Sequence, residues 1–195
     1  MGSCHIDAPF IAQMPELPRG CEVTSLAMML RHAGISADKM TLAQEIRKIP
    51  FEKDGLRGNP YDGFIGDMYS FETDGLGVYD RPIIDLARNY LGDRVVILTG
   101  QEWDAVEKQL DRGKPVWVIV NDEFRHLPDS AWQVWRTARG DIKITYREHS
   151  VLVTGYDDDF VYFNDPLAEK KGSRVDKKDF VAAWRQFDNQ AVSYI

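Results

Sequence analysis

Three residues whose types can perform acyl transfer occur in order along the chain, as Cys21, His149 and Asp165. A cysteine becomes a nucleophile when its thiolate is stabilised, and a helix N-terminus supplies a positive dipole and free N–H groups for this purpose. Cys21 opens a segment of helical spacing, so we expect the pKa of its thiol to be lowered. His149 opens an apolar, strand-like segment that can hold an imidazole in place as a general base. The pattern therefore indicates attack by a thiolate on an amide.

Such a pair also needs a group that orients the imidazole and a donor for the oxyanion. Asp165 lies 16 residues after His149, just beyond the next strand-like segment, so strand pairing can bring its carboxylate to the ring. Asn164 is the competing candidate. Gln13 precedes Cys21 by eight residues and can donate its side-chain amide to the oxyanion beside the Cys21 backbone N–H, or can simply bond to the backbone.

Five segments with apolar residues at helical spacing must position these groups, and we predict helices at 21–32, 42–48, 82–90, 103–110 and 180–187. The first is apolar over most of its surface, which is typical of a helix in the middle of a domain. Thr41 and Gln44 have the spacing of a capping box for the second helix, and Pro50 ends it.

Strand signals dominate the second half, and we predict strands at 95–98, 115–120, 142–146, 149–154, 160–163 and 191–195. The first is expected to be buried, and the three strands within 142–163 to form an antiparallel meander. Segment 122–140 is either a strand or an exposed aromatic loop, and segment 51–79 is expected to be a long ordered loop. Helices followed by a sheet indicate an α+β fold with a cleft between the two parts.

Composition limits the possible functions. The chain has 195 residues and a net charge of −7, without the basic patch that a nucleic acid requires. No apolar run is long enough to span a bilayer, so we expect a soluble chain in a single domain, 1–195. If Met1-Gly2-Ser3 is a remnant of an expression vector, a native export signal has been removed, which leaves localisation open between the cytoplasm and the secreted or cell-envelope compartments.

Other residues of interest have simpler interpretations. Cys4 and His5 lack further ligands at metal-site spacing, and the acidic run 157–159 fits a hairpin turn better than a calcium loop, so we expect no metal and no cofactor. Cys4 and Cys21 can form at most one disulfide. The tryptophans at 117 and 184 are expected in the core, whereas Trp132 and Trp135 are candidates for lining a substrate groove.

Four stretches together resemble a known family: AQMPELPRGCEVTSLAMML at 12–30, NPYDGFIGDMYS from Asn59, HSVLVTGYDDDFVYFNDPL from His149 and FVAAWRQF from Phe180. They are similar to the stand-alone branch of the bacteriocin-processing, double-glycine peptidase-like family in the papain clan. The distance from Cys21 to His149 also suits a papain-type enzyme. The transporter-linked members differ because they carry membrane and nucleotide-binding domains.

This resemblance implies a papain-like cysteine peptidase fold, with the nucleophile helix packed on an antiparallel C-terminal sheet. It also implies that Cys21 is the nucleophile, His149 the base, Asp165 of the Asp-Pro motif the orienting residue and Gln13 the oxyanion-hole residue. A peptide or protein would be the substrate. Two alternatives remain: an acyltransferase that uses the same residues, and a non-catalytic module that holds a peptide without cutting it. The sequence leaves the oligomeric state open.

Overall fold

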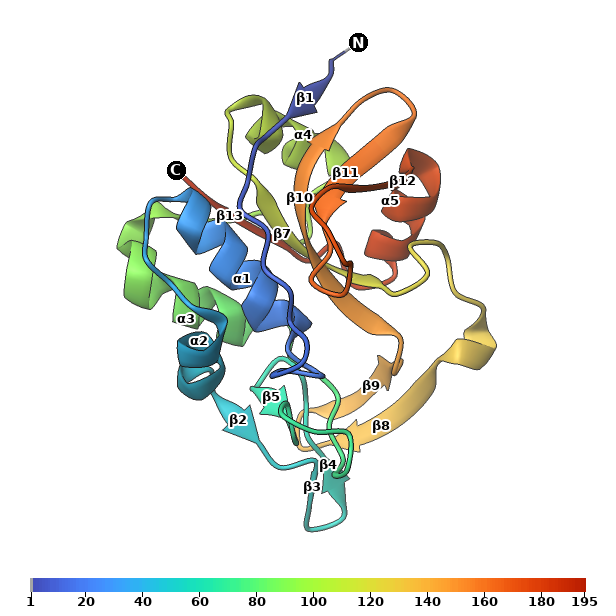
Figure 1. The fold of residues 1–195 in the computed structure, drawn as a ribbon. Helices are drawn as coiled ribbons and strands as arrows, with labels where there is room; N and C mark the ends of the chain where they lie inside the picture. The colour runs from blue at the N-terminus through green and yellow to red at the C-terminus, as the bar shows by residue number, and fades with distance from the viewer. Residues whose placement is uncertain (1) are drawn as a thin grey trace.

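The structure is a computed structural model that describes residues 2–195, so the Met1 part of the suspected vector remnant lies outside the described residues. It has a mixed α+β architecture with the papain-like arrangement that the sequence predicts (Figure 1). The helices are α1 Cys21–His32, α2 Lys39–Glu45, α3 Asp80–Leu91, α4 Trp103–Asp111 and α5 Lys177–Arg185, with 3-10 turns at Gly92–Arg94 and Asp129–Ala131. The strands are β1 Cys4–His5, β2 Lys48–Ile49, β3 Glu52–Lys53, β4 Leu56–Arg57, β5 Phe64–Ile65, β6 Val95–Ile97, β7 Val116–Asn121, β8 Gln133–Thr137, β9 Gly140–Ile144, β10 Glu148–Tyr156, β11 Phe160–Asn164, β12 Ser173–Asp176 and β13 Ala191–Tyr194.

The main sheet is antiparallel and positions the C-terminal half of the candidate site. Its strand order is β12-β11-β10-β7-β13-β6, and β1 pairs with the end of β10. β10 lies between β7 and β11, with His149 opposite Val120 and Leu152 opposite Asn164. This register brings the start of β10 and the end of β11 to the same end of the sheet. The residues that follow β11 are therefore held near His149.

Helices cover both faces of this sheet because its strands are apolar on both sides. In β7, Trp117 and Ile119 pack with α1, α2 and α3, whereas Val116, Val118 and Val120 pack with α4 and α5. This alternation is the two-residue period of a strand. Figure 1 shows α1, α2 and α3 gathered on one side of the sheet. The tryptophans at 117 and 184 are fully buried, as predicted.

A smaller lobe lies below the main sheet in Figure 1. It contains the parallel pair β2-β5 and a second sheet with the order β3-β4-β8-β9. Ile65, Trp135 and Ile144 form its apolar core. Segment 51–79 belongs to this lobe; it holds three two-residue strands and is otherwise irregular, close to the predicted ordered loop.

The predicted meander is wrong, because the strand expected at 142–146 is β9, which pairs with β8 in the smaller lobe. β10 takes β7 as its neighbour instead. The strand predicted at 191–195 becomes β13, which lies inside the sheet between β7 and β6. Short-range spacing shows that a segment is a strand, but it does not determine the strand's partners. These depend on contacts with residues far away in the sequence.

Two further predictions need correction. The second helix is Lys39–Glu45 rather than 42–48, because the Asp38 carboxylate caps it by accepting from the Met40 N–H at 2.8 Å. Thr41 donates its hydroxyl to Asp38 and so lies inside the first turn rather than at the cap. The strand at 95–98 is β6, and Ile97 is exposed because β6 is an edge strand. That all of residues 1–195 belong to a single domain stays a prediction.

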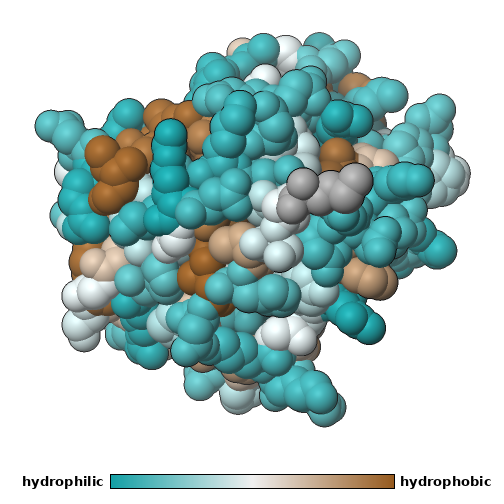
Figure 2. Space-filling model, turned by 90° about the horizontal axis from the view of Figure 1, so that it is seen from above, coloured by the Kyte–Doolittle hydropathy of each residue, from teal (hydrophilic) through white to brown (hydrophobic). Residues whose placement is uncertain are grey.

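The surface of the face shown in Figure 2 is mostly hydrophilic, and its apolar residues form separate patches. Within residues 2–195, no helix is both long and apolar enough to cross a membrane.

Candidate active site

Cys21 is the first residue of α1 and is buried. Gly20 precedes it because a β-carbon at that position would lie 2.4 Å from Cβ of Leu17, which is fully buried. The Trp117 indole donates to the Glu22 carbonyl at 3.0 Å and so ties the start of α1 to β7. As the first helical residue, Cys21 has a backbone N–H without an acceptor in the helix, which leaves it able to bind an oxyanion.

His149 is buried on β10, and its Nε2 lies 2.7 Å from Oδ1 of Asp165. Phe124 packs edge-on against the imidazole with ring centroids 6.0 Å apart. The Asn164 amide group is used elsewhere, because it donates to the carbonyls of Ala8 and Pro9. The structure therefore pairs the imidazole with Asp165, the first of the two candidates. Nδ1 is left as the ring nitrogen that can accept a proton from a thiol.

The structure brings Cys21 to the strand that carries His149. The backbone N–H of Ser150, the residue after His149, acts to lower the pKa of the Cys21 thiol. The Ser25 hydroxyl donates to the Ser150 carbonyl at 3.2 Å, which fixes α1 against β10. The thiol itself donates to Oε1 of Glu22 at 3.2 Å. Across residues 2–195, neither ring nitrogen of His149 hydrogen-bonds to this sulfur.

The expected lowering of the Cys21 thiol pKa is wrong. Burial raises this pKa well above its ordinary value, and the neighbouring carboxyl groups of Glu22 and Glu148 raise it further; the Ser150 N–H opposes them. The helix N-terminus is thus outweighed by desolvation and by two neighbouring carboxyl groups. Burial also acts to raise the pKa of Asp165, but the hydrogen bond and charge of His149 outweigh it, and the net shift is downward. Asp165 is therefore an ionised partner for the imidazole at neutral pH.

Gln13 makes backbone hydrogen bonds in the structure. Its Nε2 donates to the carbonyls of Leu17 at 3.1 Å and Pro18 at 2.9 Å, within the turn that leads to Cys21. Both amide hydrogens are therefore engaged close to the nucleophile. To serve an oxyanion, one of these bonds must be exchanged.

Glu22 and Glu148 are the residues of this site that the sequence reasoning missed. Each is adjacent in sequence to a candidate catalytic residue. Glu22 is also the one charged residue among the first ten residues of α1, and this was the available signal. The ligand atoms of Cys21, Glu22 and Glu148 lie within 4.8 Å of one another. The Cys21 thiol donates to Glu22 within this group, and we assign no metal to it.

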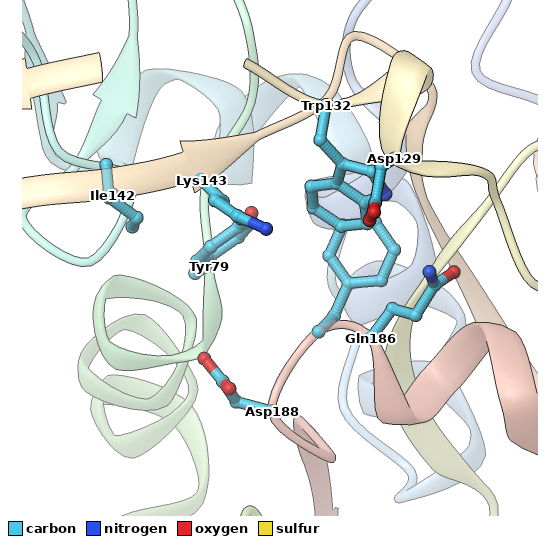
Figure 3. Close-up of a pocket in the computed structure, with 8 residues that line it drawn as sticks. Tyr79, Asp129, Trp132, Ile142, Lys143, Gln186 and Asp188 are labelled. Carbon is cyan, nitrogen blue, oxygen red and sulfur yellow. The ribbon is translucent and has the colours of Figure 1, made fainter. Parts of the chain in front are cut away.

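A cavity of about 300 Å³ is lined by residues of both lobes, and neither Cys21, His149, Glu22 nor Glu148 is among the lining residues. Figure 3 shows Tyr79, Lys143 and Trp132 gathered around it from separate segments. Burial and then the Glu148 carboxyl group raise the pKa of the Tyr79 phenol, so one residue of the cavity wall is influenced by the carboxyl pair. Trp132 lines the cavity as expected, whereas Trp135 does not, because it is buried against Phe51 in the smaller lobe.

The remaining sequence candidates have structural roles. Cys4 and Cys21 are both free, and the Cys4 thiol donates to the Leu110 carbonyl. His5 packs against the Tyr162 ring. Asp157 accepts from the backbone N–H groups of Asp159 and Phe160, which is the turn predicted for the acidic run.

Comparisons with known proteins show which family and fold the chain resembles. The sequence pattern of the Peptidase C39 like family matches residues 5–192. The uncharacterized protein YvpB of Bacillus subtilis (strain 168) is 50% identical over 179 residues, which cover 91% of this chain and 70% of YvpB. The crystal structure of a putative C39-like peptidase from Bacillus anthracis superposes with a TM-score of 0.98 at 46% identity, covering 100% of this chain and 98% of that one. Neither description names a substrate.

Proposed function

The chain belongs to the Peptidase C39 like family, and we propose that it is a cysteine peptidase with Cys21 as nucleophile, His149 as general base and Asp165 as the residue that orients the base. One observation carries the proposal: the imidazole of His149 is held at 2.7 Å by Asp165, on the strand to which the Cys21 helix is fixed by the hydrogen bond from Ser25 to Ser150. A buried imidazole with one nitrogen fixed by a carboxylate has its other nitrogen free for proton transfer.

In the proposed reaction, Nδ1 of His149 takes the thiol proton while Sγ of Cys21 attacks the carbonyl carbon of a peptide bond. The C–N bond then breaks, and the imidazolium returns the proton to the leaving amine. Water hydrolyses the resulting thioester, with His149 again accepting a proton, and the free thiol is regenerated. The Asp165 carboxylate stabilises the imidazolium that forms in both steps.

The raised thiol pKa determines how the first step proceeds. A thiol that is neutral in the free protein must lose its proton during the attack. His149 therefore acts as a true general base rather than as the partner of a preformed thiolate.

The developing oxyanion would be held by the backbone N–H of Cys21 and the side-chain amide of Gln13. The Cys21 N–H is available at the start of α1. Gln13 would exchange its bond to Leu17 or Pro18 for one to the oxyanion. Its proximity to the turn before Cys21 supports this role.

The cavity lined by Tyr79 and Trp132 is our candidate for the pocket that holds a substrate side chain. Its aromatic walls favour an apolar or aromatic group, and Lys143 and Asp188 add polar groups. Val78, next to Tyr79, donates its N–H to Glu22, so the cavity wall is connected to the nucleophile helix.

The proposal is tested with a library of peptides incubated with the protein and analysed by mass spectrometry for new termini. We expect cleavage by the native chain and a thioester on Cys21 in quenched samples. Cys21→Ala and His149→Ala should abolish cleavage, whereas the matched thiol control Cys4→Ala should retain it. Added amines distinguish hydrolysis from acyl transfer, since a transferase would yield amide products. Cleavage that persists in Cys21→Ala would refute the assignment.

A further inference from the structure

Two carboxyl groups face one another beside the nucleophile and have no role in the mechanism above. Glu22 comes from α1 and Glu148 from the start of β10, and a carboxyl oxygen of each lies within 4.8 Å of the other. The Glu22 carboxyl is fully buried. Glu148 as a whole is half-buried, but its Oε1 atom is shielded from solvent. Two carboxylates at this separation cannot both be charged in a buried site, so one of them retains a proton.

The hydrogen bonds identify which group keeps the proton. Glu22 accepts at both oxygens, from the Cys21 thiol at 3.2 Å and from the Val78 N–H at 2.8 Å, as a carboxylate does. Oε1 of Glu148 has no hydrogen-bond partner within residues 2–195. An ionised carboxylate with a buried, unpaired oxygen would cost a large amount of folding free energy. Burial and then the charge of Glu22 raise the pKa of Glu148 well above its ordinary value. Glu148 is therefore the protonated member and Glu22 the charged one.

The surrounding backbone is shaped around this pair. A β-carbon on Gly77 would lie 2.5 Å from Oε2 of Glu22 and 2.6 Å from Oε2 of Glu148. The chain at 77–78 thus approaches both carboxyls closely and supplies one N–H to them. Such close packing shows that the pair is a built feature of the site rather than an accidental contact.

We propose that Glu22 and Glu148 share one proton. The Glu22 carboxylate then accepts the hydrogen bond of the Cys21 thiol, so the thiol donates to Glu22 rather than to His149. The pair thereby sets the pH at which the nucleophile ionises. Glu22 and Glu148 act through Cys21, so they are positioning residues. The importance of this control for catalysis rests on the proposed function, but the ionisation of the thiol can be measured without any substrate.

The titratable groups at this site come from three segments. They are Cys21 and Glu22 on α1, Glu148 on β10, and the Tyr79 phenol in the segment before α3. Burial opposes the charged form of each. The Glu22 carboxylate acts on the thiol directly, because the thiol donates its hydrogen bond to this group.

The test is the pH dependence of Cys21 alkylation by iodoacetamide, followed by peptide mass spectrometry so that Cys4 is scored separately. Glu22→Gln keeps the shape and removes the charge, so the inflection for Cys21 should move to lower pH by at least one unit. This corresponds to about tenfold faster labelling at pH 7. Glu148→Gln removes the shared proton but leaves Glu22 charged, so it should move the Cys21 inflection to lower pH by less than Glu22→Gln does. Glu52→Gln, at an exposed carboxyl paired with Arg57, is the matched control and should leave the profile unchanged.

An alkylation profile of Glu22→Gln that coincides with that of the parent would overturn the proposal. If this variant does not fold, infrared spectroscopy of the native chain decides: a protonated carboxyl band should persist at pH 7 and disappear in Glu148→Gln, and its absence from the native chain overturns the proposal. A shifted alkylation profile in Glu22→Gln, without peptide cleavage by the native chain, would support this inference and contradict the proposed peptidase activity. Peptide cleavage together with an unshifted profile would support the peptidase activity and contradict this inference.

Discussion

Nε2 of His149 and Oδ1 of Asp165 are 2.7 Å apart, whereas the adjacent Asn164 hydrogen-bonds to the carbonyls of Ala8 and Pro9. The two neighbouring residues therefore have separable roles. Asp165 holds the imidazole, and Asn164 holds the N-terminal segment against the end of β11.

Substitution of these neighbours should give opposite results. Asp165→Asn removes the charge that stabilises the imidazolium, so we expect kcat to fall by on the order of 10² to 10⁴ with little change in Tm. Asn164→Ala leaves buried carbonyls without donors and should cost about 1 to 3 kcal/mol of folding free energy, with kcat retained by the folded protein. Steady-state kinetics and thermal unfolding of both variants check this. The reverse pattern would move the orienting role to Asn164.

Gln13→Ala should lower kcat by on the order of 10² to 10³ with little change in KM, since an oxyanion donor acts only when charge develops. The substitution also frees the Leu17 and Pro18 carbonyls, so some loss of Tm is expected. Cys21 alkylation should persist at the parent rate. If kcat were unchanged in the folded protein, Gln13 would serve only the turn.

Trp132→Ala should raise KM about tenfold for substrates with an aromatic or apolar side chain, because it removes one wall of the cavity. Trp135→Ala is the contrasting variant. It removes a buried ring from the smaller lobe and should cost about 3 to 5 kcal/mol without a specific effect on KM. Equal KM values for Trp132→Ala and the parent would remove the cavity from the substrate site.

Gly77→Ala should displace Glu22 and Glu148, because its β-carbon would lie under 3 Å from both carboxyls. We expect a loss of about 1 to 3 kcal/mol in the free energy of unfolding from overpacking, together with a changed pH profile of Cys21 alkylation. Gly100→Ala is the control: its β-carbon meets nothing within 4 Å, and only the positive φ of 85° is strained. An unaltered Cys21 profile in Gly77→Ala would contradict the proposed coupling.

Stability should depend on pH through Glu148. Burial, followed by the charge of Glu22, raises its pKa in the folded state above the unfolded value of about 4.3. The folded protein therefore binds the extra proton, and this contribution is fully present below the unfolded pKa and is lost as pH rises towards the folded pKa. Glu148→Gln should remove this loss of stability with rising pH. Its Tm relative to the parent should increase from pH 4 to pH 7, and a constant difference would contradict the assignment.

The sequence by itself determined the local helices and strands and the order of the candidate catalytic residues along the chain. Helix α1 was predicted with the bounds it has, because its apolar spacing and Gly34 act within a few residues. The β10–β11 hairpin was predicted for the same reason, and with it the approach of Asp165 to His149. Local periodicity and short turns require no knowledge of distant contacts.

The tertiary structure decided everything that depends on distant partners. It chose Asp165 over Asn164 and moved β9 into a separate sheet, because hydrogen bonds to remote residues determine both outcomes. It also reversed the expected shift of the Cys21 pKa. A helix N-terminus can be recognised in a sequence, but the approach of Glu148 to Cys21, 127 positions away, cannot, and electrostatic energy in a buried site depends on these distances.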